Sequence, residues 1–316
     1  MSAFEAVVGG PFAFRLAWGL LHSLWEGLLI AGALAAALPF LRGRPAARYA
    51  AGWLALVTLA ATVPLSAALA PEPVATLAGR PIVSAAPPAV AVAVQTPTAG
   101  VDPTVVDAPA VEAPAPSPVA KPVDRPSIPA RSDAWRLPRP FAPWIAGGWL
   151  VGALVLAAWR IGGWFRLRGL KRSAFPATAE LQEVLDRVSQ RLKVGRAVRL
   201  LESARVRAPA VVGWLRPVVL APVGMLAGMS IDQVELILAH ELAHVRRGDF
   251  LANLLQTAIE TLLFHHPAAW WISRTIRAER EACCDDAVIA ATGARLSYGR
   301  ALARLAELRA EPLSVS

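Results

Sequence analysis

Cysteine and charge are both scarce in this sequence. Its 316 residues include two cysteines, the neighbours Cys283 and Cys284. Neighbours on a helix do not easily reach disulfide geometry, which excludes a disulfide scaffold and favours a reducing compartment for this region. We interpret both as small, partly buried apolar residues. Charged residues make up only 17% of the chain and hydrophobic residues 55%, a composition that points to long apolar segments.

Basic residues outnumber acidic residues, and the formal net charge is +9. Such an excess can attract nucleic acid or lipid headgroups. In a membrane protein, however, arginines gather on the cytoplasmic side and set the topology. The basic residues cluster beside apolar segments and not along one motif helix, so we expect a lipid bilayer as partner and no direct contact with nucleic acid.

Three apolar segments are long enough to cross a bilayer: residues 16–41, 49–70 and 141–159. The second and third carry no charge. The first contains His22 and Glu26, which share one helical face. These two side chains could face protein or water inside the span, or lie at the outer interface beside Trp18 and Trp25.

Basic residues also set the expected orientation. They follow the first span in residues 42–48 and the third in residues 160–172. Both stretches should be cytoplasmic, which puts the N-terminus and residues 71–140 outside. More than half of the 27 prolines fall in residues 71–140, so we predict a disordered or polyproline-like extracytoplasmic linker. Composition favours a spacer over a segment that contacts the cell envelope.

Residues 166–316 have the pattern of a globular domain that is mostly helical with a small β-sheet. An amphipathic helix is expected over 179–192 and short strands over 197–203 and 209–222, with a turn between Gly213 and Pro217. A further helix should begin at Ser230 with a capping box and end at Gly248. A long helix should follow Pro267 and end near Gly293.

The helix that begins at Ser230 carries the pattern HExxH at His240, Glu241 and His244. The two histidines project to the same side and can bind one Zn²⁺. Glu241 is offset by about 100°. It is poorly placed as a ligand but can take a proton from the attacking water and pass it to the leaving amine. Two surface histidines beside a glutamate are the alternative, which the apolar neighbours disfavour.

A catalytic zinc needs three protein ligands and one open position. Glu281 on the later long helix could be the third ligand. Asp285, one turn further, could hold a ligating histidine through its other ring nitrogen. Glu279 is the competing ligand, although it has no acidic residue four positions on. Simple surface pairing of these acids with Arg277 and Arg280 is the alternative to a metal role.

The segment between the two helices leaves several questions open. Residues 250–266 are mainly apolar, but the segment is too short and contains too many polar residues for a fourth span, so an interfacial or a buried helix would fit.

Three further residues are candidates for roles in the site. His265 and Tyr298 could stabilise an oxyanion, whereas a polar helix end is the alternative for His265 and His266. Asp249 could cap the following helix or organise the site.

Three stretches resemble a known family: GWLRPVVLAP (213–222), ILAHELAHVRRGDFLANLLQ (237–256) and HHPAAWWISRTIRAEREACCDDAVI (265–289). They are similar to the integral-membrane metallopeptidases of the BlaR/MecR type and, more distantly, to the HtpX-type membrane proteases. The resemblance covers most of the chain outside residues 71–140. It implies a gluzincin-like zinc site, with His240, His244 and Glu281 as ligands, Glu241 as catalytic base and Asp285 as support.

In that family a signal received outside activates a cytoplasmic protease, which cleaves itself or a DNA-binding repressor. The resemblance therefore implies a zinc endopeptidase of the bacterial inner membrane that acts on a cytoplasmic protein in signal transduction. The alternative is a non-catalytic receptor or scaffold with a structural zinc. The receptors of the family carry a fourth span and a penicillin-binding sensor after the protease. Neither is found before Ser316, so the sequence is either a piece of a longer receptor or a relative without such a sensor, and a β-lactam ligand is not expected.

Overall fold

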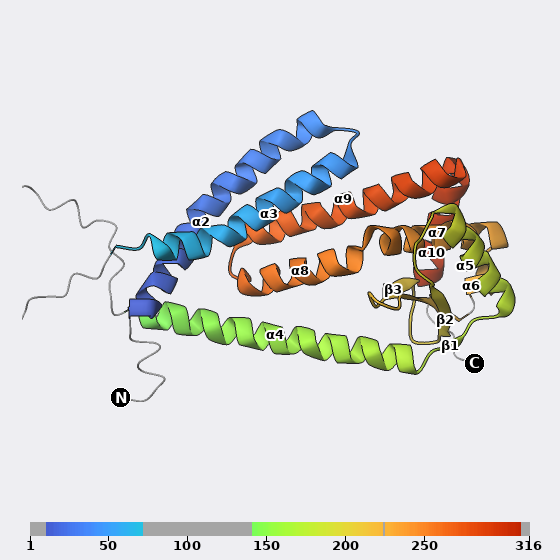
Figure 1. Cartoon of the computed structure of the whole chain (residues 1–316), viewed down its shortest axis with the longest axis horizontal. Helices are drawn as coiled ribbons and strands as arrows, with labels where there is room; N and C mark the ends of the chain where they lie inside the picture. Colours follow the sequence, from blue (N-terminus) through green and yellow to red (C-terminus); the bar gives the residue numbers. More distant parts are fainter. Residues whose placement is uncertain (1–10, 72–140, 224, 311–316) are drawn as a thin grey trace, which may run out of the picture. The chain divides into compact units, whose positions relative to one another are not determined.

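The computed structural model describes residues 11–71, 141–223 and 225–310. Its N-terminal part is a helical hairpin of α2 (Pro11–Ala37) and α3 (Pro45–Ala68), joined through the 3-10 helix η1 (Leu38–Leu41). The helix α4 (Ala142–Arg172) packs against α2 (Figure 1). By length and composition these three helices are candidate membrane spans, which confirms the prediction of three.

The helices are longer than the predicted spans. α2 is described from Pro11 onward. α3 begins at Pro45, because proline suits the first turn of a helix. α4 continues past residue 159 to Arg172 without a break, since a charged residue ends an apolar run but not a helix. Apart from Pro71, the predicted linker lies outside the described residues.

Glu26 faces the neighbouring span. Its Oε1 accepts a hydrogen bond of 2.7 Å from the Ser66 hydroxyl on α3. The ring of His22 stacks on Trp18, with 4.1 Å between ring centroids. Of the two interpretations of this pair, the structure supports the one in which the carboxylate faces protein inside the span.

The rest of the chain is a mostly helical domain with a small mixed sheet. The strand order is β1-β2-β4-β3, where β2 and β4 are parallel and the outer pairs are antiparallel. The strand β1 was not predicted, because a strand of two residues is too short to show an alternating pattern of apolar and polar side chains. The elements in chain order are β1 (Phe175–Pro176), α5 (Ala179–Arg191), β2 (Arg199–Ser203), β3 (Ala210–Val212), β4 (Val218–Pro222), α6 (Met225–Gly228), α7 (Ile231–Arg247), α8 (Asp249–Leu262), α9 (Pro267–Thr292) and α10 (Arg295–Ala310).

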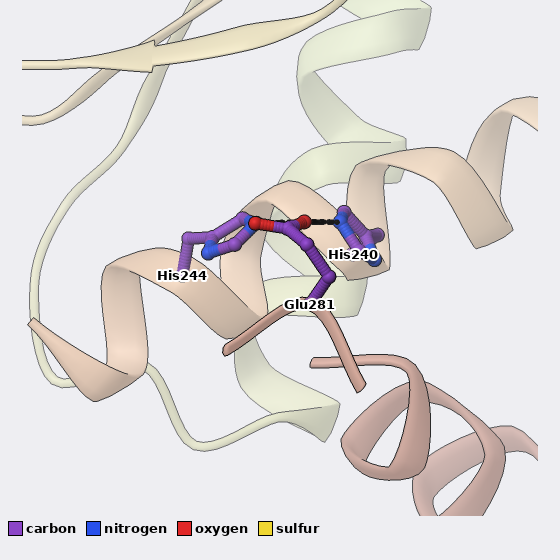
Figure 2. A group of neighbouring side chains, drawn as sticks. All are labelled: His240, His244 and Glu281. Atoms are coloured by element: carbon purple, nitrogen blue, oxygen red, sulfur yellow. Dashed lines mark hydrogen bonds and ion pairs between the residues drawn. The ribbon is translucent and has the colours of Figure 1, made fainter. Parts of the chain in front are cut away.

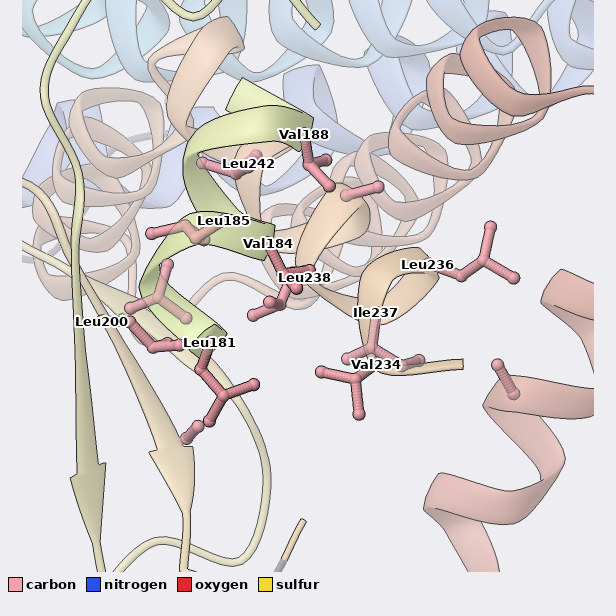
Figure 3. Packing of buried hydrophobic residues seen from close by; sticks show 14 of the residues in the cluster. Leu181, Val184, Leu185, Val188, Leu200, Val234, Leu236, Ile237, Leu238 and Leu242 are labelled. Atoms are coloured by element: carbon pink, nitrogen blue, oxygen red, sulfur yellow. The ribbon is translucent and has the colours of Figure 1, made fainter. Parts of the chain in front are cut away.

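The core of this domain fixes the position of α7. Apolar side chains of α5 pack against α7, as Figure 3 shows for Leu185 and Val188 beside Leu238 and Leu242. All four are at most 2% exposed. A helix held along one whole face cannot rotate, so its opposite face presents side chains in a fixed direction.

Both ends of α7 follow the predicted signals. Ser230 Oγ accepts from the Gln233 N–H, and the Gln233 side chain accepts from the Ser230 N–H, which completes a capping box. Gly248 ends the helix in the left-handed conformation with φ of 72°. The chain therefore turns within one residue from α7 into α8.

Helices α8 and α9 form a second hairpin, and its tip contacts all three spans (Figure 1). His266 Nε2 donates to the Ser23 carbonyl of α2 over 2.8 Å. Trp149 Nε1 of α4 donates to the Leu262 carbonyl over 2.8 Å. Ile272 and Ile276 of α9 are fully buried in one cluster with Leu56 and Leu59 of α3. Residues 250–266 thus belong to a hairpin packed between the spans.

Two sets of buried charges reinforce these contacts. Arg160 of α4 pairs with Glu260 of α8 over 3.1 Å, and Arg277 of α9 pairs with the same carboxylate. Arg48 of α3 pairs with Glu279 of α9 over 2.9 Å. Every acid in these contacts is at most 6% exposed at its side chain. The long helix α9 is therefore linked to two spans by ion pairs.

Candidate metal centre

His240 and His244 of α7 meet Glu281 of α9 at one point (Figure 2). The two histidine Nε2 atoms lie 3.3 Å apart. Glu281 Oε2 lies 3.4 Å from each of them. Three potential ligand atoms thus form a nearly equilateral triangle, each vertex supplied by one side chain.

This triangle has the dimensions of a zinc site. Zn²⁺ is bound at about 2.0–2.1 Å by histidine nitrogen and carboxylate oxygen, and a tetrahedron with such bonds has edges of roughly 3.3 Å. The three observed edges are 3.3, 3.4 and 3.4 Å. Two imidazole nitrogens and one carboxylate are also the donor types that zinc accepts. The residues therefore fit a zinc ion with one position left open.

Each histidine also makes contacts at its Nδ1 atom, on the side of the ring that faces away from Glu281. Behind His240 lie Asp285 Oδ1 at 3.2 Å and the Tyr298 hydroxyl at 2.7 Å, and this hydroxyl donates to Asp285. Behind His244 lies Asp249 Oδ2 at 2.8 Å. An acceptor at Nδ1 keeps the proton there, which leaves the Nε2 lone pair directed at the shared point.

The same contacts shift the ionisation of the site. Burial lowers the pKa of His240, but the Asp285 and Glu281 carboxylates outweigh it and raise this pKa to about 9. Burial also opposes protonation of His244, yet Asp249 above all raises its pKa well above the usual value. Hydrogen bonds from His240 and then His244 hold the pKa of Glu281 well below its usual range. A metal would have to displace protons from both Nε2 atoms.

Cys284 belongs to this network, although the sequence suggested only a small apolar residue. Its Sγ lies 3.3 Å from His244 Nδ1 and donates to Asp249 Oδ2 over 3.6 Å. Burial raises the pKa of this thiol. The spacing offered one usable signal, since Cys284 lies three residues after Glu281 and so on nearly the same helical face.

The triangle opens into a cleft of about 580 Å³. Glu241 lines this cleft beside the two histidines. The lining also includes Val211 of β3 and the following Gly213 and Trp214. Because β3 is an edge strand, one side of its backbone is not paired within the sheet. The site therefore combines an acid beside the metal position with an open strand edge.

Two other candidate residues from the sequence, Glu279 and His265, lie away from the two histidines. Glu279 points away from the site to Arg48, so Glu281 is the acid that meets the histidines. His265 precedes α9, about 21 Å along the helix from Glu281 at 1.5 Å per residue, and does not line the cleft. It cannot stabilise an oxyanion there, and that expectation is corrected.

Tyr298 and Asp249 also take positions that change their interpretation. The Tyr298 hydroxyl lies behind His240 on the Nδ1 side and not where an oxyanion would form. This position favours a positioning role over that of an oxyanion donor. Asp249 makes no side-chain cap at the start of α8. Its carboxylate contacts His244 instead, so of its two possible roles the structure supports the organisation of the site.

The site has the donor set and the open cleft of a metal-dependent hydrolase. Comparison with protein families agrees with this class. The profile of the family described as BlaR1 peptidase M56 matches residues 39–314. The chain therefore belongs to the BlaR1 peptidase M56 family.

Curated relatives match parts of the chain. The regulatory protein BlaR1 of Bacillus licheniformis is 23% identical over 164 residues, which are 51% of this chain and 27% of that protein. A protease HtpX homolog of Bacillus licheniformis is 42% identical over 67 residues, 20% of this chain and 23% of that protein. The methicillin resistance mecR1 protein of Staphylococcus aureus is 20% identical over 169 residues, 52% and 29% of the two chains. The matches thus span under a third of each relative.

Proposed function

We propose that this protein is a membrane-bound zinc endopeptidase whose metal is held by His240, His244 and Glu281. The observation that carries the proposal is the triangle of ligand atoms with edges of 3.3–3.4 Å beside an open cleft. Membership in a peptidase family supports it. A structural zinc is usually enclosed by four protein ligands, whereas three converge here, so the geometry favours catalysis over a scaffold.

Zinc bound there would supply a Lewis acid for the scissile carbonyl and for the attacking water. Glu241 lines the cleft next to the ligands, so its carboxylate is placed to take a proton from that water and deliver it to the leaving amine. Asp285, Tyr298 and Asp249 keep the histidines in the tautomer that leaves Nε2 free.

The substrate is proposed to bind as an extended strand. β3 offers an unpaired backbone edge, and Val211, Gly213 and Trp214 around it line the cleft. A peptide added along this edge would form main-chain hydrogen bonds and pass in front of the metal position. This mode selects an unfolded segment or a loop of a protein, which fits an endopeptidase.

The peptidase domain is proposed to face the cytoplasm. The basic end of α3 supports this, because Arg48 pairs with Glu279 and the Tyr49 ring lies 5.0 Å from the Arg247 guanidinium. The metal centre thus lies near the end of the span that the positive-inside rule assigns to the cytoplasm. Reporter fusions after Ala70 and after Arg172 test it. An enzyme that works only outside the cytoplasm should be active in the first fusion alone, and the opposite result rejects the topology.

A cytoplasmic regulator, or the chain itself, is the proposed substrate, in transmembrane signal transduction. The printed names of the relatives, a regulatory protein and a methicillin resistance protein, support this direction. The test compares protein N-termini across the proteome between cells with the wild type and cells with Glu241→Gln. New N-termini that depend on Glu241 should come from very few cytoplasmic proteins. Identical sets of N-termini in both strains would contradict the proposal.

A further inference from the structure

Four cations from two separate elements surround one pocket at the end of α4. Arg168, Lys171 and Arg172 come from the last turns of this helix, and Arg199 comes from β2. The pocket has a volume of about 440 Å³, and no acidic residue lines it. In the described ranges, no carboxylate forms an ion pair with any of the four. Like charges in one pocket repel each other, so the arrangement is complementary to an anion.

The surface of α4 places this pocket at the level of lipid headgroups. Exposed apolar side chains continue along the helix to Ile161, Trp164 and Phe165. Arg160 is the only charge within this apolar stretch, and it forms an ion pair with Glu260. Residues 142–165 are about 36 Å long as a helix, enough for a hydrocarbon core of about 30 Å with some tilt. The cations of α4 that line the pocket follow within a few residues of the end of this stretch.

Aromatic residues mark the same boundary. The Arg168 guanidinium lies over the Trp164 ring, 3.6 Å from its centroid. Tryptophan is enriched where the bilayer meets water. A cation stacked on such a ring is held at the interface, close to the phosphates of the leaflet at this end of the span.

We propose that this pocket, lined by Arg168, Lys171, Arg172 and Arg199, binds the phosphate headgroup of an anionic phospholipid. Guanidinium groups suit phosphate oxygens, and basic pockets at this depth attract anionic lipids. The occupant is a lipid and not a soluble anion, because the pocket adjoins the end of the apolar surface of α4, where acyl chains lie.

Such a lipid would tie the sheet of the peptidase domain to the third span. Arg199 lies on β2, and the same strand contributes Leu201 to an apolar cluster that Leu167 and Leu170 of α4 join. β2 pairs with β4, which pairs with the cleft-lining edge strand β3. We therefore expect the headgroup to stabilise the packing of the sheet against α4. This effect does not depend on whether the metal centre cleaves peptides.

The test uses the full chain in nanodiscs of phosphatidylcholine with and without phosphatidylglycerol. The variant Arg168→Gln/Lys171→Gln/Arg199→Gln retains Arg166 and Arg172 as topology signals. The control Arg187→Gln/Arg295→Gln/Arg300→Gln removes the same charge from exposed positions on α5 and α10. We expect phosphatidylglycerol to raise the thermal unfolding midpoint of the wild type and the control. Native mass spectrometry should find it bound to both.

For the pocket variant we expect phosphatidylglycerol binding to weaken on the order of 100-fold, since each cation near an anionic surface contributes a factor of about five. The midpoint shift should be lost with it. Equal binding and equal shifts in both triple variants would overturn the site. An equal shift of the wild type by inorganic phosphate in phosphatidylcholine nanodiscs would show a soluble anion as the occupant and overturn the lipid assignment.

Discussion

At the residue scale, the metal centre is built from pairs of contacts on opposite sides of each imidazole. His244 has Glu281 at Nε2 and Asp249 at Nδ1. His240 has Glu281 at Nε2 and the Asp285–Tyr298 pair at Nδ1. These contacts fix both rings before any metal arrives, so affinity should depend on the groups behind the rings as well as on the ligands.

Asp249→Asn should weaken zinc binding about 10- to 100-fold, the usual effect of losing the acid behind a histidine ligand. The amide can still accept a hydrogen bond but no longer stabilises the ring by charge. A chelator competition titration of the purified protein measures this. Asp286→Asn is the matched control, since Asp286 is exposed on α9. If both variants bind zinc as the wild type does, Asp249 has no part in the site.

Tyr298→Phe distinguishes a positioning role from an oxyanion role. Because the hydroxyl lies behind His240, its loss should weaken zinc binding, and saturating zinc should restore kcat. Removal of a true oxyanion donor lowers kcat about 10²- to 10³-fold even when the metal is bound. Steady-state kinetics over a zinc titration therefore decides the role, and a persistent loss of kcat would contradict the structure.

The parts of the candidate site that can be predicted from the sequence are those whose geometry is local. His240 and His244 lie one turn apart on a helix whose capping signals at Ser230 and Gly248 are also local. For Cys284 the sequence offered only the helical face that it shares with Glu281, since its contact with His244 depends on the crossing of α7 and α9. The oxyanion candidate His265 could not be tested from the sequence, because its separation from Glu281 depends on the length of α9.

At the element scale, α9 connects the metal centre to the membrane part. Glu281 meets the histidines, while Glu279, two residues earlier, points to Arg48 of α3. Further towards its start, Ile272 and Ile276 are buried against α3, and Arg277 joins Arg160 of α4 at Glu260. A shift of either span would therefore act on the helix that carries the third ligand.

Glu260→Gln should destabilise the fold by about 3–5 kcal/mol, because it leaves the cations Arg160 and Arg277 together without their acid. Thermal unfolding in detergent should show a clearly lower midpoint. Glu235→Gln, which removes only the more exposed pair with Arg191, should cost at most about 1 kcal/mol. Equal midpoints for the two variants would mean that the buried cluster does not hold the hairpin.

Gly27→Ala tests the contact between the hairpin tip and the first span. A Cβ at residue 27 would lie 2.3 Å from the His266 ring, whereas a Cβ at Gly32 meets nothing within 4 Å. Overpacking of this kind costs about 1–3 kcal/mol, so Gly27→Ala should lower the unfolding midpoint. Gly32→Ala on the same helix should leave it unchanged or raise it. A neutral Gly27→Ala would mean that the tip does not pack here.

Elements with a clear period or cap were predictable, and pairings between distant elements were not. The apolar runs indicated the three spans, and five apolar positions indicated α5. The α8–α9 hairpin gave an ambiguous pattern, because its apolar face packs against spans more than 100 residues away along the chain. Gln256 and Glu260 left an interfacial and a buried helix both open, and the structure buries both side chains against partners on α4 and α9.

At the scale of the whole molecule, the spans and the peptidase domain share structure. The helix α9, which carries Glu281, lies along α3, the sheet packs on the end of α4, and the hairpin tip contacts all three spans. This interlocking supports a peptidase whose membrane part is more than an anchor.

The most direct measurement of the central claim compares purified wild type and Glu241→Gln for zinc content and for cleavage of a peptide library. Both should bind one zinc per chain, and the variant should lose cleavage about 10²- to 10⁴-fold, the usual contribution of a general base. Glu235→Gln on the same helix should behave as the wild type. Undiminished cleavage by zinc-loaded Glu241→Gln, or a wild type that binds no zinc, would contradict the account.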